Sequence, residues 1–171
     1  MEKKYRLLEN DTKKVNGKTL YRIEALRDFA DVKKGDKGGY VEKEENLSHE
    51  GSCWVYGKAR VSGNAEIYGN ARVSGNARVS GNAEIYGNAE VYGDAEVRFT
   101  RDYVVLKNIW SSGRYFTYTR SNKMWKVGCF YGTGEELIKK AYKDSEVSGR
   151  EYKRVVEYVE AMYADLEKEK E

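Results

Sequence analysis

The chain has 171 residues and a formal charge of +3, the small difference between 31 basic and 28 acidic side chains. Such a balance argues against a dedicated binder of long nucleic acids, whose affinity rests on many uncompensated phosphate contacts. No stretch approaches the apolar length of a membrane span, and the first residues lack the apolar run of a secretory signal. We therefore expect a soluble protein of a reducing compartment.

The cysteine and histidine content excludes the usual metal sites. The chain has two cysteines, Cys53 and Cys129, and one histidine, His49. Two cysteines this far apart form neither a disulfide framework nor a metal-ligand spacing. We expect no metal site and no cofactor.

Residues 1–52 are predicted to form an N-terminal β cap followed by an irregular first coil. Residues 5–8 and 19–26 alternate as strands do, and Asn16-Gly17 between them is a hairpin signal. Such a cap would cover one open edge of the repeat that follows.

Residues 53–98 contain a short repeat. From Val55 onward, seven consecutive six-residue units have Gly in third place and Ala in fifth, as in VSGNAE and IYGNAR. A period of six fits neither an α-helix nor a coiled coil, but it fits a short strand and a tight corner. Gly, in most units followed by Asn, enters positive φ cheaply and can form the corner. The Val or Ile and the Ala of each unit are predicted to face inward.

A second, longer period predicts how the units stack. The segment VSGNAEIYGN at 61–70 recurs identically at 79–88, a displacement of three units. If three strands make one turn, Ile67 lies over Ile85 and Tyr68 over Tyr86. The sequence therefore predicts a three-sided parallel coil.

These units resemble the hexapeptide-repeat, left-handed parallel β-helix proteins, and the Gly-Asn-Ala variant looks like the short members found in phages and prophages. The resemblance implies a left-handed coil, a homotrimer and a location in the cytoplasm of a bacterial host. The fold class expected is thus an all-β left-handed parallel β-helix with three hexapeptides per coil, flanked by the β cap and a C-terminal module.

Residues 99–171 are predicted to form that module, a small α+β unit. Strands are expected over 103–110, 114–119 and 123–130, followed by two helices. Thr133-Gly134-Glu135-Glu136 is a capping box for the first helix, and Ser148-Gly149-Arg150-Glu151 is one for the second.

The resemblance also raises acyl transfer, because many hexapeptide-repeat proteins are acyltransferases with a histidine base. His49 stands in a Ser-His-Glu-Gly context that indicates neither a tuned pKa nor a reactive group within reach. We interpret it as a polar surface residue, name no catalytic residue, and expect that the chain is not an enzyme.

Two surfaces are candidate binding sites. Outward tyrosines are predicted to form an oligomer interface, because they bury area at low entropic cost, although the same rings could instead stack a base or a sugar. They are Tyr56, Tyr68, Tyr86 and Tyr92. Interleaved aromatic and cationic residues of the C-terminal module suit a nucleotide, although the same aromatics could form the module's core. This second set is Arg114, Tyr118, Arg120, Lys123, Trp125, Lys126, Tyr131 and Thr133.

The function predicted from these observations is non-catalytic, oligomeric binding. The phage-type resemblance implies a sponge that sequesters a cyclic or ADP-ribose-like nucleotide of bacterial immunity. Two alternatives stay open: a hexapeptide acyltransferase, and a structural or assembly protein without a small-molecule ligand.

Overall fold

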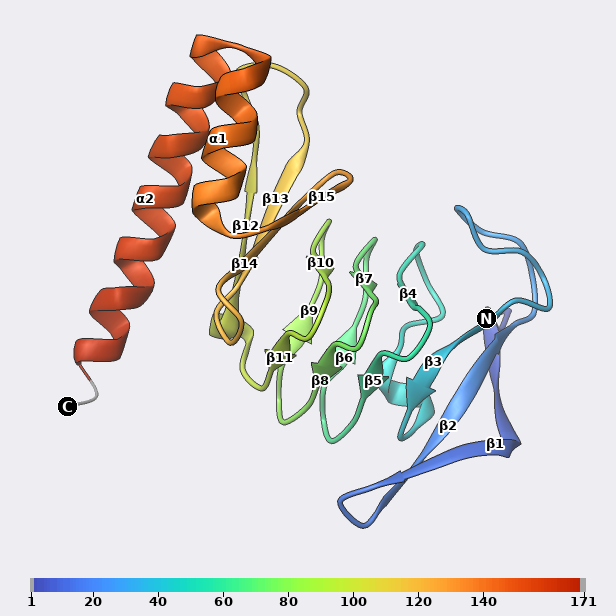
Figure 1. Ribbon diagram of the computed structural model, residues 1–171. Coiled ribbons are helices and arrows are strands. Elements are labelled where there is room, and N and C mark those ends of the chain that lie inside the picture. The colour runs from blue at the N-terminus through green and yellow to red at the C-terminus, as the bar shows by residue number, and fades with distance from the viewer. Residues whose placement is uncertain (1, 170–171) are drawn as a thin grey trace. The chain divides into compact units, whose positions relative to one another are not determined.

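The computed structural model describes residues 2–169, which form two compact units. The first unit ends at Asp102 and the second begins at Tyr103. The first contains a parallel β-solenoid, and the second an antiparallel sheet with two helices (Figure 1).

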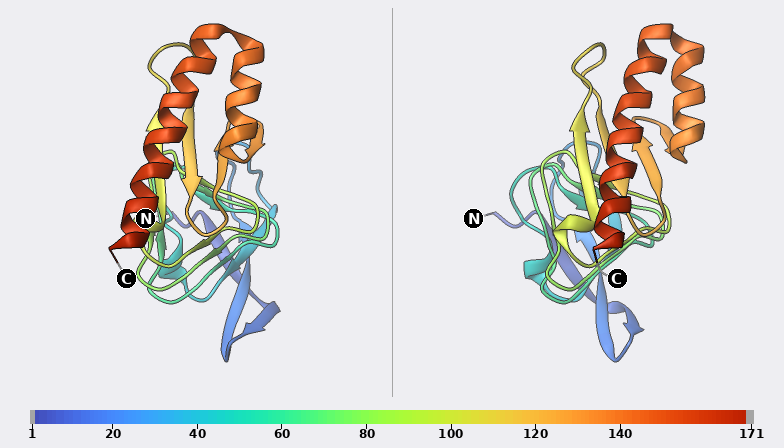
Figure 2. Two further views of the ribbon diagram at one scale, coloured as in Figure 1. Left: turned by 60° about the vertical axis from the view of Figure 1, so that its left-hand side comes forward. Right: turned by 90° about the vertical axis from the view of Figure 1, so that its left-hand side faces the viewer.

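The solenoid is built from eight strands of two residues each. They are β4 (Trp54–Val55), β5 (Arg60–Val61), β6 (Glu66–Ile67), β7 (Arg72–Val73), β8 (Arg78–Val79), β9 (Glu84–Ile85), β10 (Glu90–Val91) and β11 (Glu96–Val97). Each of β4 to β8 pairs in parallel with the strand three places further on, which gives the sheets β5-β8-β11, β4-β7-β10 and β6-β9. The predicted three-sided parallel coil is confirmed, and Figure 2 shows successive coils superposed.

The register of the coils is the 18-residue step. Ile67 pairs with Ile85, and Arg60 with Arg78. The Val, Ile and Ala positions of the repeat are all buried, with at most 1% of their surface exposed. The solenoid core therefore consists of one large and one small apolar side chain per unit, as predicted.

Glycine makes the corners. Gly75 has a φ of +68°, and a Cβ placed on it would lie 2.8 Å from the backbone nitrogen of Gly93 in the next coil. Side-chain amides run alongside: Asn64 Nδ2 donates to Asn82 Oδ1 at 3.3 Å. At Gly75, a residue with a side chain would be strained by the positive φ and would also overlap the backbone of the next coil.

A hairpin extends one sheet of the solenoid. Strands β1 (Tyr5–Val15) and β2 (Lys18–Ala25) are antiparallel, and Asn16 and Gly17 turn between them with φ of 50° and 78°. Strand β2 pairs with β3 (Lys37–Val41), which pairs with β5 in the solenoid. Strand β1 is longer than predicted because it continues beyond an irregularity between Leu8 and Thr12. Short 3-10 turns lie at Glu44–Asn46 and Thr100–Asp102.

The second unit is an antiparallel sheet packed on two helices. Its strands are β12 (Tyr103–Lys107), β13 (Tyr115–Thr119), β14 (Met124–Val127) and β15 (Phe130–Gly132), and its helices are α1 (Gly134–Asp144) and α2 (Glu146–Lys168). Phe116 and Trp125 from the sheet and Leu137 and Val159 from the helices share one hydrophobic core. The predicted order of strands then helices is confirmed, with β15 as an additional strand.

The two helix starts differ in how well they were predicted. Thr133 caps α1, and its capping box with Glu136 is present. The predicted start of α2 at Ser148 is wrong, because the Ser145 hydroxyl already accepts a hydrogen bond from the Ser148 N–H and the helix begins at Glu146.

Across residues 2–169, neither helix is long and apolar enough to cross a membrane.

Candidate functional site: a cationic cleft beside the hairpin

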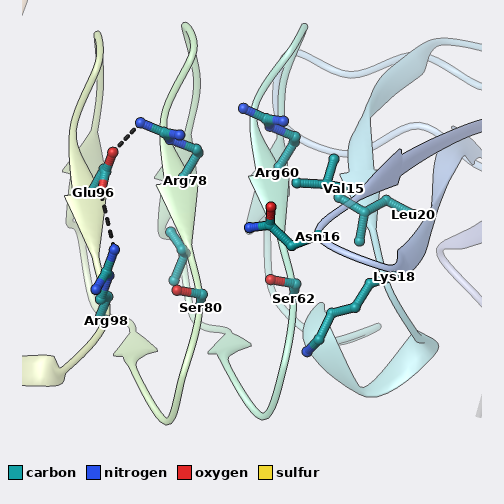
Figure 3. A pocket seen from close by; sticks show the side chains of 11 residues that line it. Val15, Asn16, Lys18, Leu20, Arg60, Ser62, Arg78, Ser80, Glu96 and Arg98 are labelled. Atoms are coloured by element: carbon teal, nitrogen blue, oxygen red, sulfur yellow. Dashed lines mark hydrogen bonds and ion pairs between the residues drawn. The ribbon is translucent and has the colours of Figure 1, made fainter.

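A cleft of about 250 Å³ lies where the hairpin tip meets the face formed by β5, β8 and β11 (Figure 3). We call this feature the cleft. Its lining residues are Val15, Asn16, Lys18, Leu20, Arg60, Ser62, Arg78, Val79, Ser80, Glu96 and Arg98.

The repeat places the polar lining in two rows. The residue before each inward Val points outward, so Arg60, Arg78 and Glu96 follow one another in register across three coils. We call these three the arginine row. The residue after each inward Val also points outward and forms a second row of Ser62, Ser80 and Arg98. Neighbouring strands lie about 4.8 Å apart, so side chains in a row are close neighbours.

The hairpin supplies the opposite wall. Val15 and Leu20 present apolar side chains to the cleft, and Asn16 lies at the turn (Figure 3). Lys18 forms an ion pair with Glu42 at 3.1 Å. Glu42 also accepts a hydrogen bond from the Gly63 N–H, which lowers the pKa of its carboxyl group.

Charge in the cleft is positive and unevenly paired. Arg78 forms an ion pair with Glu96, and Arg98 Nη2 lies 3.6 Å from the same carboxylate. Among the described residues, the Arg60 guanidinium has neither a hydrogen bond nor an acidic partner. Like charges one strand apart repel each other, so an unpaired Arg60 next to Arg78 makes this end of the cleft a favourable place for an anion.

His49 is not the surface residue expected from the sequence. Its Nδ1 accepts a hydrogen bond from the Lys4 N–H at 3.0 Å, and its Nε2 lies 2.7 Å from Glu44 Oε1. The imidazole stacks on Tyr5 with a centroid separation of 4.3 Å, and 14% of the side chain is exposed. Because both ring nitrogens are engaged, His49 ties the N-terminal strand to the first coil.

The four outward tyrosines lie on two different faces of the solenoid. Tyr68 and Tyr86 stack with centroids 5.2 Å apart and planes 7° from parallel, and the Tyr68 hydroxyl donates to Glu84. Tyr56 and Tyr92 follow β4 and β10 on another face. The Tyr56 hydroxyl donates to Asp31, which places this ring against the loop before β3. A subunit interface at these tyrosines remains a prediction.

The candidate ligand residues of the second unit are divided between its core and its surface. Tyr118 and Trp125 are buried in the hydrophobic core, with their rings 4.9 Å apart. Lys126 and Tyr131 are cross-strand neighbours, on the sheet face opposite Trp125. Thr133 caps α1.

The three remaining members of that set are also placed by the structure. Arg120 lies over the ring of Tyr163, Arg114 lies beside Gly128, and Lys123 stands at a turn with a φ of 55°. The set therefore does not converge on one pocket, and nucleotide binding there remains a prediction.

The coil geometry defines a β-solenoid built from hexapeptide repeats. A family of sequences described as "YdcK Beta solenoid repeat" matches this chain at residues 65–81 and 71–84. These matches lie inside the solenoid, in β6 to β9.

One relative carries the name of that repeat. The chain is 44% identical over 48 residues to "Uncharacterized acetyltransferase YdcK" of Escherichia coli (strain K12). The alignment covers 28% of this chain and 14% of that protein. The prediction that this chain is not an enzyme is contradicted by this similarity, because the relative is named as an acetyltransferase.

The cleft itself was missed as a site by sequence reasoning. The 18-residue step does place Arg60 next to Arg78 and Glu96. Nothing in the sequence, however, places the hairpin tip beside them, since that contact is tertiary. In the part of the chain that the structure describes, no cluster of acidic, histidine or cysteine side chains could hold a metal ion.

Proposed function

We propose that this protein binds a phosphate-bearing small molecule in the cleft. The observation that carries the proposal is the unpaired guanidinium of Arg60, which lines a cavity next to a second arginine. Arginine presents planar, fork-like donors that match phosphate oxygens, and charge-assisted hydrogen bonds of this kind are strong.

The remaining walls suit the other end of such a ligand. Val15 is half-buried and offers a small apolar patch against which a base or an acyl group can pack, while Leu20 is buried behind it. The hydroxyls of Ser62 and Ser80 are additional donors and acceptors. A volume of about 250 Å³ is slightly below the usual range for drug-sized ligands. The cleft therefore suits one phosphate and a compact group attached to it.

Two kinds of molecule share this chemistry. One is a nucleotide signal that the protein would sequester, as the phage-type resemblance implies. The other is an acyl-coenzyme A, whose 3′-phosphate, a single phosphate separate from its diphosphate bridge, would enter the same cleft. The name of the E. coli relative favours the second.

Calorimetric titration with a cyclic mononucleotide, ADP-ribose and acetyl-coenzyme A tests the binding proposal. We expect at least one of them to bind and Arg60→Gln to weaken its binding about tenfold or more, as for the loss of a charged hydrogen bond. Arg72→Gln is the matched control, because Arg72 precedes an inward Val in the same way but lies on another face, paired with Asp31. The proposal fails if none binds, or if Arg60→Gln binds as tightly as the wild type.

Acetyl transfer is the second candidate function, and the relative's name is the observation that favours it. The test is release of coenzyme A thiol from acetyl-coenzyme A in the presence of a panel of amine and hydroxyl acceptors. Release that depends on the acceptor and falls in Arg60→Gln supports transfer at the cleft. No release with any acceptor removes this candidate.

Assembly into a homotrimer through the outward tyrosines is part of the proposal. Tyr86 is 45% exposed and already stacks with Tyr68, so it could pack against another subunit. Light scattering of the purified protein should give three times the 19.7 kDa chain mass, and Tyr86→Arg should lower it. A monomeric mass for the wild type would overturn the trimer without affecting the cleft.

A further inference from the structure

Glu96 occupies the end of the arginine row, and its position limits how much negative charge the cleft can take. The row begins with an unpaired arginine, Arg60, continues with Arg78, and ends with a carboxylate (Figure 3). Glu96 contacts both Arg78 and Arg98. Two of the three arginines of the cleft are therefore already engaged by one internal anion.

We infer that Glu96 makes the cleft selective for a ligand with a single phosphate over one with a diphosphate. The inference rests on the binding function proposed above and adds the class of ligand. A first phosphate fits at Arg60, which has no partner. The second phosphate of a diphosphate would extend from Arg60 toward Arg78, and so toward the Glu96 carboxylate that already pairs with Arg78.

The charge of the ligand alone would predict the opposite preference. ADP carries more negative charge than AMP, so a simple cationic cleft would bind ADP more tightly. With Glu96 in place, the second phosphate must either displace an ion pair or remain beside a like charge. The cleft is thus expected to bind AMP at least as tightly as ADP, despite its net positive charge.

Substitution of Glu96 by glutamine tests this selectivity. Glutamine keeps the size and one oxygen acceptor of Glu96 but removes its charge, which frees Arg78 and Arg98. The ratio of the ADP affinity to the AMP affinity should rise about tenfold or more in Glu96→Gln. Glu90→Gln is the matched control, because Glu90 is the in-register neighbour of Arg72 on another face and its loss changes the net charge equally.

The results separate the inference from the proposed function. If AMP binds to the wild type but Glu96→Gln leaves the ADP-to-AMP ratio unchanged, the selectivity role of Glu96 is overturned while the binding site stands. A wild-type protein that binds ADP more tightly than AMP overturns the inference without any variant. If neither nucleotide binds and the panel above also fails, both proposals fall.

Discussion

Gly75 and Gly93 lie one above the other at a corner of the solenoid, so close that a methyl group on Gly75 would meet the Gly93 backbone nitrogen at 2.8 Å. Gly75→Ala should therefore destabilise the protein through both steric overlap and positive-φ strain. Gly87→Ala is the matched control, because Gly87 has a φ of +63° but nothing within 4 Å of the added carbon. We expect a lower midpoint of urea unfolding for Gly75→Ala than for Gly87→Ala; equal midpoints would mean that backbone strain alone accounts for the loss.

Replacement of His49 by alanine should lower the free energy of unfolding without removing any catalytic activity. The change leaves the Lys4 N–H without its acceptor and removes the stacking on Tyr5. An unsatisfied buried donor costs about 1–3 kcal/mol, which chemical denaturation can measure. Glu44→Gln, which keeps an oxygen facing His49, should cost less. A folded His49→Ala protein that binds acetyl-coenzyme A normally but has lost all transfer activity would contradict a structural role.

Gly149 in α2 is a place where alanine should destabilise a helix. In an exposed helix, Gly→Ala stabilises by about 1 kcal/mol. Here the added Cβ would lie 2.2 Å from Cδ1 of Tyr142 in α1, so the ring must move. We expect Gly149→Ala to lower the melting temperature and the double variant with Tyr142→Ala to lose less than the two single changes together. Strict additivity would show that the two residues do not compete for the same space.

Stability should fall at acidic pH partly through Glu42. Its folded-state pKa lies below the ordinary carboxyl value of 4.5, because the Gly63 N–H donates to it and Lys18 pairs with it. A depressed carboxyl pKa adds stability that is present above the unfolded-state value and is lost as pH falls through the folded-state value. The stability difference between the wild type and Glu42→Gln should therefore shrink between neutral pH and about pH 3.

The measurement is denaturant unfolding of both proteins across that pH range. Glu45→Gln serves as the comparison, because Glu45 is an exposed residue of the 3-10 turn that follows Glu42 and its replacement makes the same change of charge. A difference between wild type and Glu42→Gln that stays constant with pH would contradict the depressed pKa.

The solenoid could be predicted from the sequence because every determinant of one strand and its corner lies within a single six-residue unit. The corner glycine, the inward Val or Ile and the small Ala each act locally, and the 18-residue identity sets the register. Ile67 over Ile85 follows directly from that step. The prediction of where α2 begins was wrong for an equally local reason. Ser145 and Ser148 are both good N-cap residues, and only Ser145 caps the helix.

Features that depend on tertiary contact could not be predicted in this way. Lys4 stands in a charged run that suggests a solvated side chain, yet it is fully buried, with Nζ donating to the Cys53 carbonyl at 2.8 Å. Burial lowers its pKa. The cleft is a second such case, because Leu20 and Arg60 become neighbours only when the hairpin lies beside the coils.

The identical segments at 61–70 and 79–88 have a consequence for how this molecule can change over generations. Each coil of the solenoid contacts only the coils before and after it. An in-frame duplication or loss of one whole coil would therefore leave both ends of the solenoid with their original neighbours. Recombination between the matching stretches of the gene would produce such a change in a single event. Natural variants can therefore differ in the number of coils without changes in the rest of the protein.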